Sequence, residues 1–105
     1  MKVEKESACP ATRLLTLLSK RHMLLILYTL TKGESGFVEL QETLHINTAS
    51  LSIRLRELQD AQLIARRECK KDSRQHYYYL TTMGIAISRL IEHISTVARN
   101  NIHMT

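Results

Sequence analysis

The stretch NTASLSIRLREL, residues 47–58, places leucines at helical spacing and fills the intervening positions with small, hydroxyl and guanidinium side chains. Leu51, Leu55 and Leu58 fall on one side of a helix, so the other side must face something outside the core. Small side chains allow close approach to a surface, hydroxyls can donate to phosphates or base edges, and arginines can reach a phosphate or a guanine. The candidate recognition residues are Thr48, Ala49, Ser50, Ser52, Ile53, Arg54 and Arg56.

A second basic group lies in KKDSRQ, residues 70–75, between two segments whose composition favours β-strand. This spacing predicts a hairpin with the charged stretch as its turn. Lys70, Lys71 and Arg74 would then lie at the tip of the hairpin, where they could contact a nucleic-acid backbone or minor groove.

The two cysteines, Cys9 and Cys69, have different predicted surroundings. Pro10 suits the first position of a helix, which makes Cys9 the N-cap. Unpaired backbone N–H groups and the positive end of the helix dipole stabilise a thiolate there, and Arg13 adds positive charge one turn later. Cys69 lies at a strand end beside two lysines and lacks a helix terminus. We therefore expect Cys9 to be the more reactive thiol.

Composition narrows the class of protein. The 105 residues are consistent with one domain over 1–105, and 15 Lys and Arg against 10 Asp and Glu favour a polyanionic partner, nucleic acid before an anionic membrane. The longest apolar run, residues 23–30, is too short to span a bilayer, and the N-terminus does not resemble a signal peptide, so a cytoplasmic location without membrane contact is expected.

Motifs for a metal site or for catalysis are missing from the sequence. The five histidines lack metal-ligand spacing, and there is no phosphate-binding glycine loop or nucleophile motif. We expect neither an enzyme nor a cofactor or metal.

The apolar periodicity changes along the chain and predicts the elements that position these residues. The segment 21–33 is apolar almost all round and should form the central buried helix, and GESG, residues 33–36, should be a turn. Asn47 is a suitable N-cap for the recognition segment, and Thr81 or Thr82 can cap the last helix. The expected helices cover about 10–19, 21–33, 37–44, 48–62 and 82–103, and the expected strands cover 63–69 and 76–81.

Two helices joined by a short turn and followed at once by a basic hairpin form the winged helix-turn-helix pattern. The fold class is therefore mainly α with a small β-hairpin, an α+β fold. By itself the outer side of residues 47–58 could be an ordinary solvated surface, with Arg56 and Glu57 in a local ion pair. The helix, the hairpin and its basic tip together favour binding of double-stranded DNA.

Several segments of the chain resemble the HxlR-type branch of the MarR-like winged-helix regulators, over about residues 9–95. The N-terminal CP points to this branch, whereas the other segments recur across winged-helix regulators. The matching segments are CP (9–10), LLILYTL (24–30), FVEL (37–40), INTASLSIRLREL (46–58), LIARR (63–67) and YYLTTMG (78–84).

This resemblance implies a prokaryotic transcription regulator that binds an inverted-repeat operator as a homodimer, with the terminal helices at the dimer interface. It also implies that Cys9 is a candidate sensor of oxidants or electrophiles, that 48–56 is the recognition segment and that 70–75 is the wing. The chain departs from the family twice: SKRH (19–22) stands where Gly-Lys-Trp is usual, and the wing lacks prolines.

The terminal helices carry more apolar residues than a small monomer can cover, which independently predicts a homodimer. The two recognition segments would then lie about 34 Å apart, one turn of duplex, or a multiple of it. The expected interface residues are Leu14, Leu17, Leu18, Ile87, Leu90, Ile91 and Ile94.

The alternative function is a protein-interaction winged helix whose basic face does not bind DNA. Strong salt dependence of duplex binding would distinguish this function from DNA binding. No effector can be named.

Overall fold

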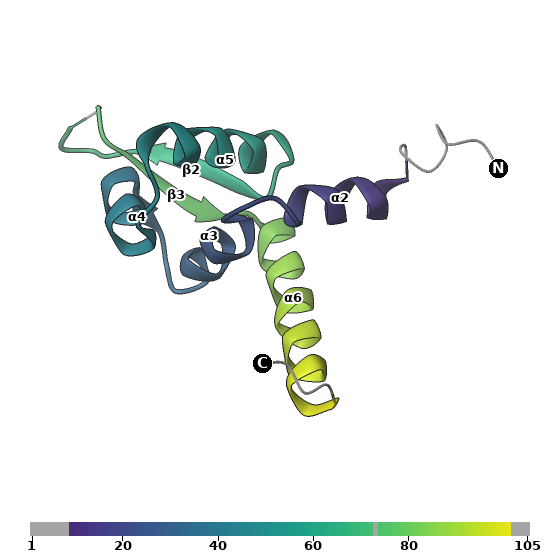
Figure 1. Ribbon diagram of the computed structural model, residues 1–105. Coiled ribbons are helices and arrows are strands. Elements are labelled where there is room, and N and C mark those ends of the chain that lie inside the picture. Colours follow the sequence, from purple (N-terminus) through teal and green to yellow (C-terminus); the bar gives the residue numbers. More distant parts are fainter. Residues whose placement is uncertain (1–8, 73, 102–105) are drawn as a thin grey trace.

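The computed structural model describes residues 9–72 and 74–101, which form five helices and a three-stranded antiparallel sheet (Figure 1). The α+β winged-helix fold expected from the sequence is confirmed, and so is the order of its helices and hairpin. The elements are α2 (Pro10–Leu18), α3 (Met23–Leu30), β1 (Ser35–Gly36), α4 (Phe37–Leu44), α5 (Thr48–Asp60), β2 (Ile64–Glu68), β3 (His76–Leu80) and α6 (Thr82–Asn101).

The sheet has one strand more than the predicted hairpin. Strand order is β1-β3-β2, with Ser35 opposite Tyr78 and Gly36 opposite Tyr77. The prediction of a simple turn at residues 33–36 was therefore wrong in its second half. A two-residue strand has too little periodicity to be recognised in a sequence, and it forms here because β3 offers a free edge.

Local capping fixes where the helices begin. The Asn47 side-chain oxygen accepts a hydrogen bond from the Ser50 N–H at 2.8 Å, as predicted for the start of α5. Thr81 caps α6, because its hydroxyl oxygen accepts from the Gly84 N–H at 3.0 Å. Cys9 is the N-cap of α2 with proline at the helix start, also as predicted, although its side chain makes no capping hydrogen bond.

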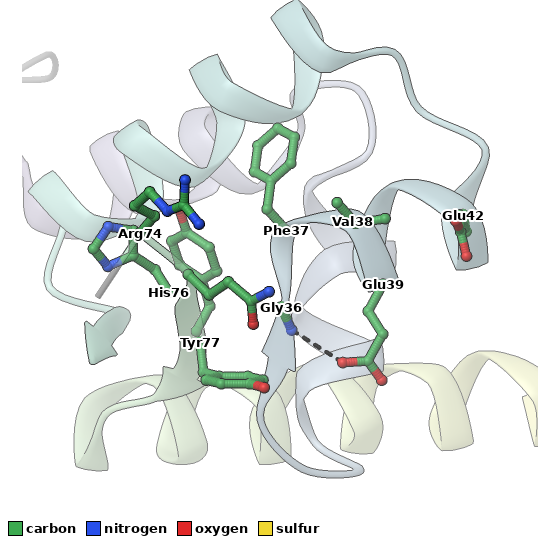
Figure 2. Close-up of a pocket in the computed structure, with 10 residues that line it drawn as sticks. Gly36, Phe37, Val38, Glu39, Glu42, Arg74, His76 and Tyr77 are labelled. Carbon is green, nitrogen blue, oxygen red and sulfur yellow. Dashed lines mark hydrogen bonds between the residues drawn. The ribbon is translucent and has the colours of Figure 1, made fainter. Parts of the chain in front are cut away.

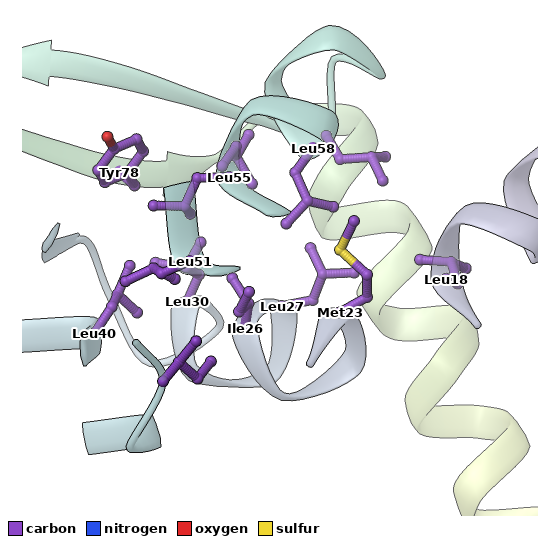
Figure 3. Close-up of a cluster of buried hydrophobic side chains, with 13 residues drawn as sticks. Leu18, Met23, Ile26, Leu27, Leu30, Leu40, Leu51, Leu55, Leu58 and Tyr78 are labelled. Carbon is purple, nitrogen blue, oxygen red and sulfur yellow. The ribbon is translucent and has the colours of Figure 1, made fainter. Parts of the chain in front are cut away.

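The core is an aliphatic cluster enclosed by α3, α4, α5 and the sheet (Figure 3). Leu51, Leu55 and Leu58 of α5 are at most 1% exposed, and burial of each stabilises the fold by about 1.5–3 kcal/mol. They meet Ile26 and Leu27 of α3, which are equally inaccessible. The remaining buried hydrophobic members are Leu18, Met23, Leu30, Leu40, Ile46, Leu63, Ile64 and Tyr78.

Helix α3 is central but only half enclosed, which corrects the prediction of a helix buried on all sides. Its inner face lies in the core, whereas Leu24, Leu25 and Tyr28 are 48%, 54% and 60% exposed. The sequence pattern could not distinguish this apolar outer face from a buried one, because both faces carry the same residue types.

Helix α6 leaves the body at the end of β3 and extends away from it (Figure 1). Gly84 sits against the backbone of Leu63: a Cβ at this position would lie 2.0 Å from the Leu63 carbonyl oxygen. Ile87 and Ile91 pack against the core, but Leu90 and Ile94 are 59% and 62% exposed. No helix within residues 9–72 and 74–101 is long and apolar enough to cross a membrane.

The predicted interface residues of α2 also divide between the body and the surface. Leu18 is 8% exposed and belongs to the core, which corrects its assignment to the dimer interface. Leu14 and Leu17 are partly buried and pack against the same core. The exposed leucine of this helix is Leu15, at 61%, which the sequence analysis did not single out.

Candidate nucleic-acid interface

The outer face of α5 is a surface of small and hydroxyl-bearing side chains. Its leucines are buried, so Thr48, Ala49 and Ser52 turn outward and are exposed, and Ser50 is half-buried. Ile53 is 56% exposed on the same helix. Arg56 is also exposed and makes no ion pair among the described residues. All seven predicted recognition residues are therefore at least partly exposed, but they differ in how far their side chains are engaged inside the protein.

Arg54 is half-buried and its guanidinium is engaged inside the protein, so that it reaches a phosphate or a guanine stays a prediction. Its Nε donates to the Arg21 carbonyl oxygen at 3.0 Å, and its Nη1 donates to Glu57 Oε1 at 2.6 Å. Glu57 also pairs with Lys20, and these two cations, Lys20 first, hold the pKa of the Glu57 carboxyl below its usual value. The carboxylate therefore ties α5 to the loop after α2, and Arg54 serves this link.

The start of α5 is fixed against α4 by side chains. Gln41 Nε2 donates to the Thr48 hydroxyl oxygen at 2.7 Å, which joins the two helices across their turn. Together with the Asn47 cap, this bond fixes the first turn of α5, whose N–H groups point outward as in any helix start. A helix end of this kind favours an approaching phosphate.

The tip of the hairpin between β2 and β3 carries the predicted wing cations. Lys70 and Lys71 are exposed, and the Arg74 side chain is 90% exposed. Arg74 contacts Asp72 through its backbone N–H at 3.0 Å and its Nε at 3.2 Å, and it holds the pKa of that carboxyl below the usual range. Arg74 is therefore partly neutralised, while both lysines remain free of ion pairs among the described residues.

The hairpin is held near its tip by a contact that the sequence analysis missed. Arg67 of β2 forms a two-pronged ion pair with Glu34, with Nε 2.8 Å from Oε2, and its guanidinium lies 4.9 Å from the centre of the Tyr77 ring. The pair lowers the pKa of Glu34 and raises that of Arg67. Nothing in the sequence marks two residues 33 positions apart as partners.

A hollow of about 520 Å³ lies between the start of α4 and β3 (Figure 2). Glu39 reaches back so that its Oε1 accepts from the Gly36 N–H at 3.2 Å. Glu42 lines the same wall, and the Nδ1 atom of His76 is buried without a hydrogen-bond partner in the part of the chain that the structure describes. The hollow is thus lined by two carboxylates and, at the side of the wing tip, by Arg74.

Both cysteines have a lowered thiol pKa. At Cys9 the nearby backbone N–H of Thr12 comes first, then the Thr12 hydroxyl and the N–H of Ala11; these donors favour the thiolate, although the thiol makes no capping hydrogen bond. At Cys69 the causes are the backbone N–H groups of Lys71 and Asp72. The start of α2 and the hairpin tip lie at opposite ends of the molecule (Figure 1). That Cys9 is the more reactive of the two stays a prediction.

Comparison with known proteins agrees with the observed fold. A family described as HxlR-like helix-turn-helix matches residues 17–105. The reduced form of the transcriptional regulator YodB from B. subtilis is 28% identical, with a TM-score of 0.79 and coverage of 90% of this chain and 95% of that one. The diamide-treated form of YodB from B. subtilis is 27% identical, with a TM-score of 0.75 and coverage of 91% of this chain and 97% of that one. The transcriptional repressor BigR from Xylella fastidiosa, 24% identical, has the same fold with a TM-score of 0.71 over 97% of this chain and 96% of its own. No curated protein of matching sequence was found.

Proposed function

The chain belongs to the HxlR-like helix-turn-helix family of transcription regulators, and on this premise we propose that it binds double-stranded DNA sequence-specifically, as a homodimer on an inverted-repeat operator. The observation that carries the proposal is the pairing of two surfaces. The outer face of α5 is small and rich in hydroxyls, and the neighbouring hairpin ends in exposed Lys70 and Lys71.

The chemistry of the two surfaces suits two tasks on a duplex. A major groove accepts a helix whose outward side chains are short enough for the helix to enter, as Ala49 and Ser52 are. Arg56 can reach a phosphate or a guanine edge from the next turn. The hairpin lysines are long and flexible, so they suit contacts with the phosphate backbone, which depend on charge rather than on a fixed geometry.

The deciding experiment is duplex binding measured at several salt concentrations after selection of a site from random DNA. We expect affinity to fall steeply with salt, because bound lysines and arginines release counterions. Arg56→Ala or Ser52→Ala should weaken the selected site by about 1–3 kcal/mol and relax its base preference. Lys71→Ala or Arg74→Ala should weaken all duplexes alike and lower the salt slope by about one unit for each lost phosphate contact.

Arg54→Gln provides the matched control on the same helix, because Arg54 is engaged with Glu57 and the Arg21 carbonyl. It should affect stability more than base preference. Affinity that ignores salt, together with wing variants that bind duplex like the wild type, would instead favour a protein-interaction module. The apolar outer face of α3 would then be its first candidate surface.

The homodimer part of the proposal rests on the exposed stripe of α6. Leu90, Ile94 and Val97 are 59%, 62% and 45% exposed and recur at helical spacing. Ile94→Glu should leave a folded monomer in sedimentation at micromolar concentration. Thr96→Glu, which adds the same charge to an exposed position off the stripe, should leave the dimer intact.

We further propose that Cys9 makes the regulator responsive to oxidants or electrophiles. Two observations support this: hydrogen-bond donors at the start of α2 lower the pKa of Cys9, and YodB is represented in both reduced and diamide-treated forms. Thiol-labelling rates against pH should give Cys9 the faster reaction. Mild oxidation should change operator affinity in the wild type and in Cys69→Ser, but not in Cys9→Ser. An ordinary labelling profile at Cys9, with affinity indifferent to its oxidation, would remove the switch and leave the regulator.

A further inference from the structure

A polar hollow of about 330 Å³ lies between the second half of α5 and strand β2. Arginines from both elements line it: Arg56 from α5 and Arg66 from β2. Asp60 is the one carboxylate among its lining residues. The other polar groups of the wall can each donate a hydrogen bond, and they belong to Ser52, Gln59 and Tyr78.

Strand alternation explains why Arg66 faces α5. Ile64 is buried under α5, and residues two apart on a strand share a face, so Arg66 follows Ile64 toward the helix. Arg67 points to the opposite face, where it pairs with Glu34. The two consecutive arginines of β2 therefore differ: Arg67 has a partner inside the protein, whereas Arg66 has no ion pair among the described residues.

The same division occurs on α5. Arg54 is bound to Glu57, whereas Arg56 makes no ion pair among the described residues, and neither does Arg66. Each element thus contributes one paired arginine to the body and one unpaired arginine to the hollow. Two guanidinium groups against a single carboxylate leave the hollow with a positive charge. A planar guanidinium fork matches the oxygens of a phosphate or a carboxylate, so an oxyanion is the ligand that this hollow suits.

We propose that this hollow, the α5–β2 oxyanion site, binds a phosphate group of the DNA backbone. The inference rests on the proposed function and adds Arg66, Gln59 and Tyr78 to the residues that contact DNA. A duplex that receives α5 in its major groove and meets the hairpin tip with its backbone must pass one strand across the junction of α5 and β2. The site lies at that junction and would hold one phosphate for each protomer.

The first arm of the test compares Arg66→Gln with Arg89→Gln in the full chain. Arg89 lies exposed on α6 without an ion pair among the described residues, so both variants lose one charge. With a pool of 30-base-pair random duplexes as probe, Arg66→Gln should lower affinity about tenfold. It should also lower the salt slope by about one unit per protomer. Arg89→Gln should change neither. Arg66→Lys, which keeps the charge but loses the fork, should restore the slope and only part of the affinity.

The second arm uses inorganic phosphate without DNA. Phosphate should raise the melting temperature of the wild type and of Arg89→Gln above the value in sodium chloride of equal ionic strength, and this gain should vanish in Arg66→Gln. If the phosphate gain depends on Arg66 but the duplex affinity does not, the site takes a free phosphate-bearing molecule and the DNA assignment is overturned.

The failures of the site and of the proposed function are distinguishable. If the wild type binds duplex and Arg66→Gln behaves like Arg89→Gln in both arms, the oxyanion site is overturned and the regulator stands. If the wild type binds no duplex at low salt, the proposed function fails, and with it the backbone phosphate as the occupant of the hollow.

Discussion

Two apolar stripes with the same helical spacing differ in burial: the one on α5 is buried, and the one on α6 is largely exposed. On α5, Leu51 and Leu55 are at most 1% exposed, whereas on α6 Leu90 and Ile94 are 59% and 62% exposed. Leucine or isoleucine recurs every three to four residues in both helices. The difference lies in what surrounds each helix: α5 is packed on the core, while α6 leaves the body beyond its first turns (Figure 1).

The comparison separates what stabilises the protomer from what is available to a partner. Residues of α5 gain their burial free energy from contacts inside one chain. The outer residues of α6 can gain theirs only from a second molecule, because Ile87 and Ile91 are the members of that helix that reach the core cluster. The two stripes should therefore respond differently to the same truncation.

The largest effect is expected from Leu55→Ala, which should lower the free energy of unfolding by about 2–5 kcal/mol through lost burial and a cavity. Leu90→Ala removes the same atoms from an exposed position and should change the stability of the isolated protomer by no more than about 0.5 kcal/mol. Urea unfolding followed by circular dichroism measures both.

Protein concentration sharpens this contrast. If α6 dimerises, Leu90→Ala should destabilise the protein at high concentration and approach the wild type on dilution, because dimer stability follows mass action. Leu55→Ala should destabilise it equally at every concentration. A penalty for Leu90→Ala that persists on dilution would mean that α6 packs on its own body after all.

The junction of the two regions gives the next largest effect. Gly84→Ala should cost about 3 kcal/mol, because the new Cβ would lie 2.0 Å from the Leu63 carbonyl and backbone cannot turn aside as a side chain can. Gly36→Ala is the control: its Cβ would meet Tyr77 at an ordinary 3.7 Å, and the loss should stay under about 1 kcal/mol. Thermal unfolding of both variants decides whether α6 depends on this close approach.

Much of the fold was open to prediction because it depends on local signals. The leucine period of α5, the Asn47 cap and the β-favouring residues on either side of KKDSRQ each specify an element without reference to the rest of the chain. Strand β1 and the exposed face of α3 were missed for the converse reason. A two-residue strand is defined by its partner, and an apolar face shows whether it is covered only when its neighbours are known.

The candidate site divides along the same line. The residue types identified the small and hydroxyl side chains of α5 and the basic side chains of α5 and the hairpin tip. They could not tell Arg54 from Arg56, because the difference depends on Glu57 and Arg21 and on the direction in which each side chain leaves the helix. Arg66 was missed because an arginine in a predicted strand looks like any solvated charge until α5 is placed beside it.

A smaller effect should distinguish the starts of α5 and α2. Asn47→Ala removes a side-chain cap of 2.8 Å and should cost about 1 kcal/mol. Cys9→Ala removes a side chain that makes no capping bond and should cost much less. Chemical denaturation of the two variants under reducing conditions measures the difference. Equal losses would mean that the Cys9 thiol stabilises α2 in a way that its geometry does not reveal.

The smallest expected effect concerns the ion pairs of Glu57, which lies on α5 and binds Lys20 beyond the end of α2 and Arg54 on its own helix. These cations lower the pKa of the folded Glu57 below the ordinary value of 4.5. A lowered pKa means that the ionised carboxylate is favoured by folding, so its contribution to stability is present above that value and is lost as the pH falls through the folded pKa.

Glu57→Gln should therefore lower stability by up to about 1 kcal/mol at pH 7, as for other partly exposed pairs. The difference from the wild type should shrink in acid. Glu42→Gln, at an exposed position on α4 without an ion pair among the described residues, should leave the pH profile unchanged. Denaturant titrations from pH 7 down to acid measure all three proteins. A Glu57→Gln deficit of the same size at every pH would show that the carboxylate acts through packing rather than charge, and that Lys20 and Arg54 do not hold α2 and α5 together electrostatically.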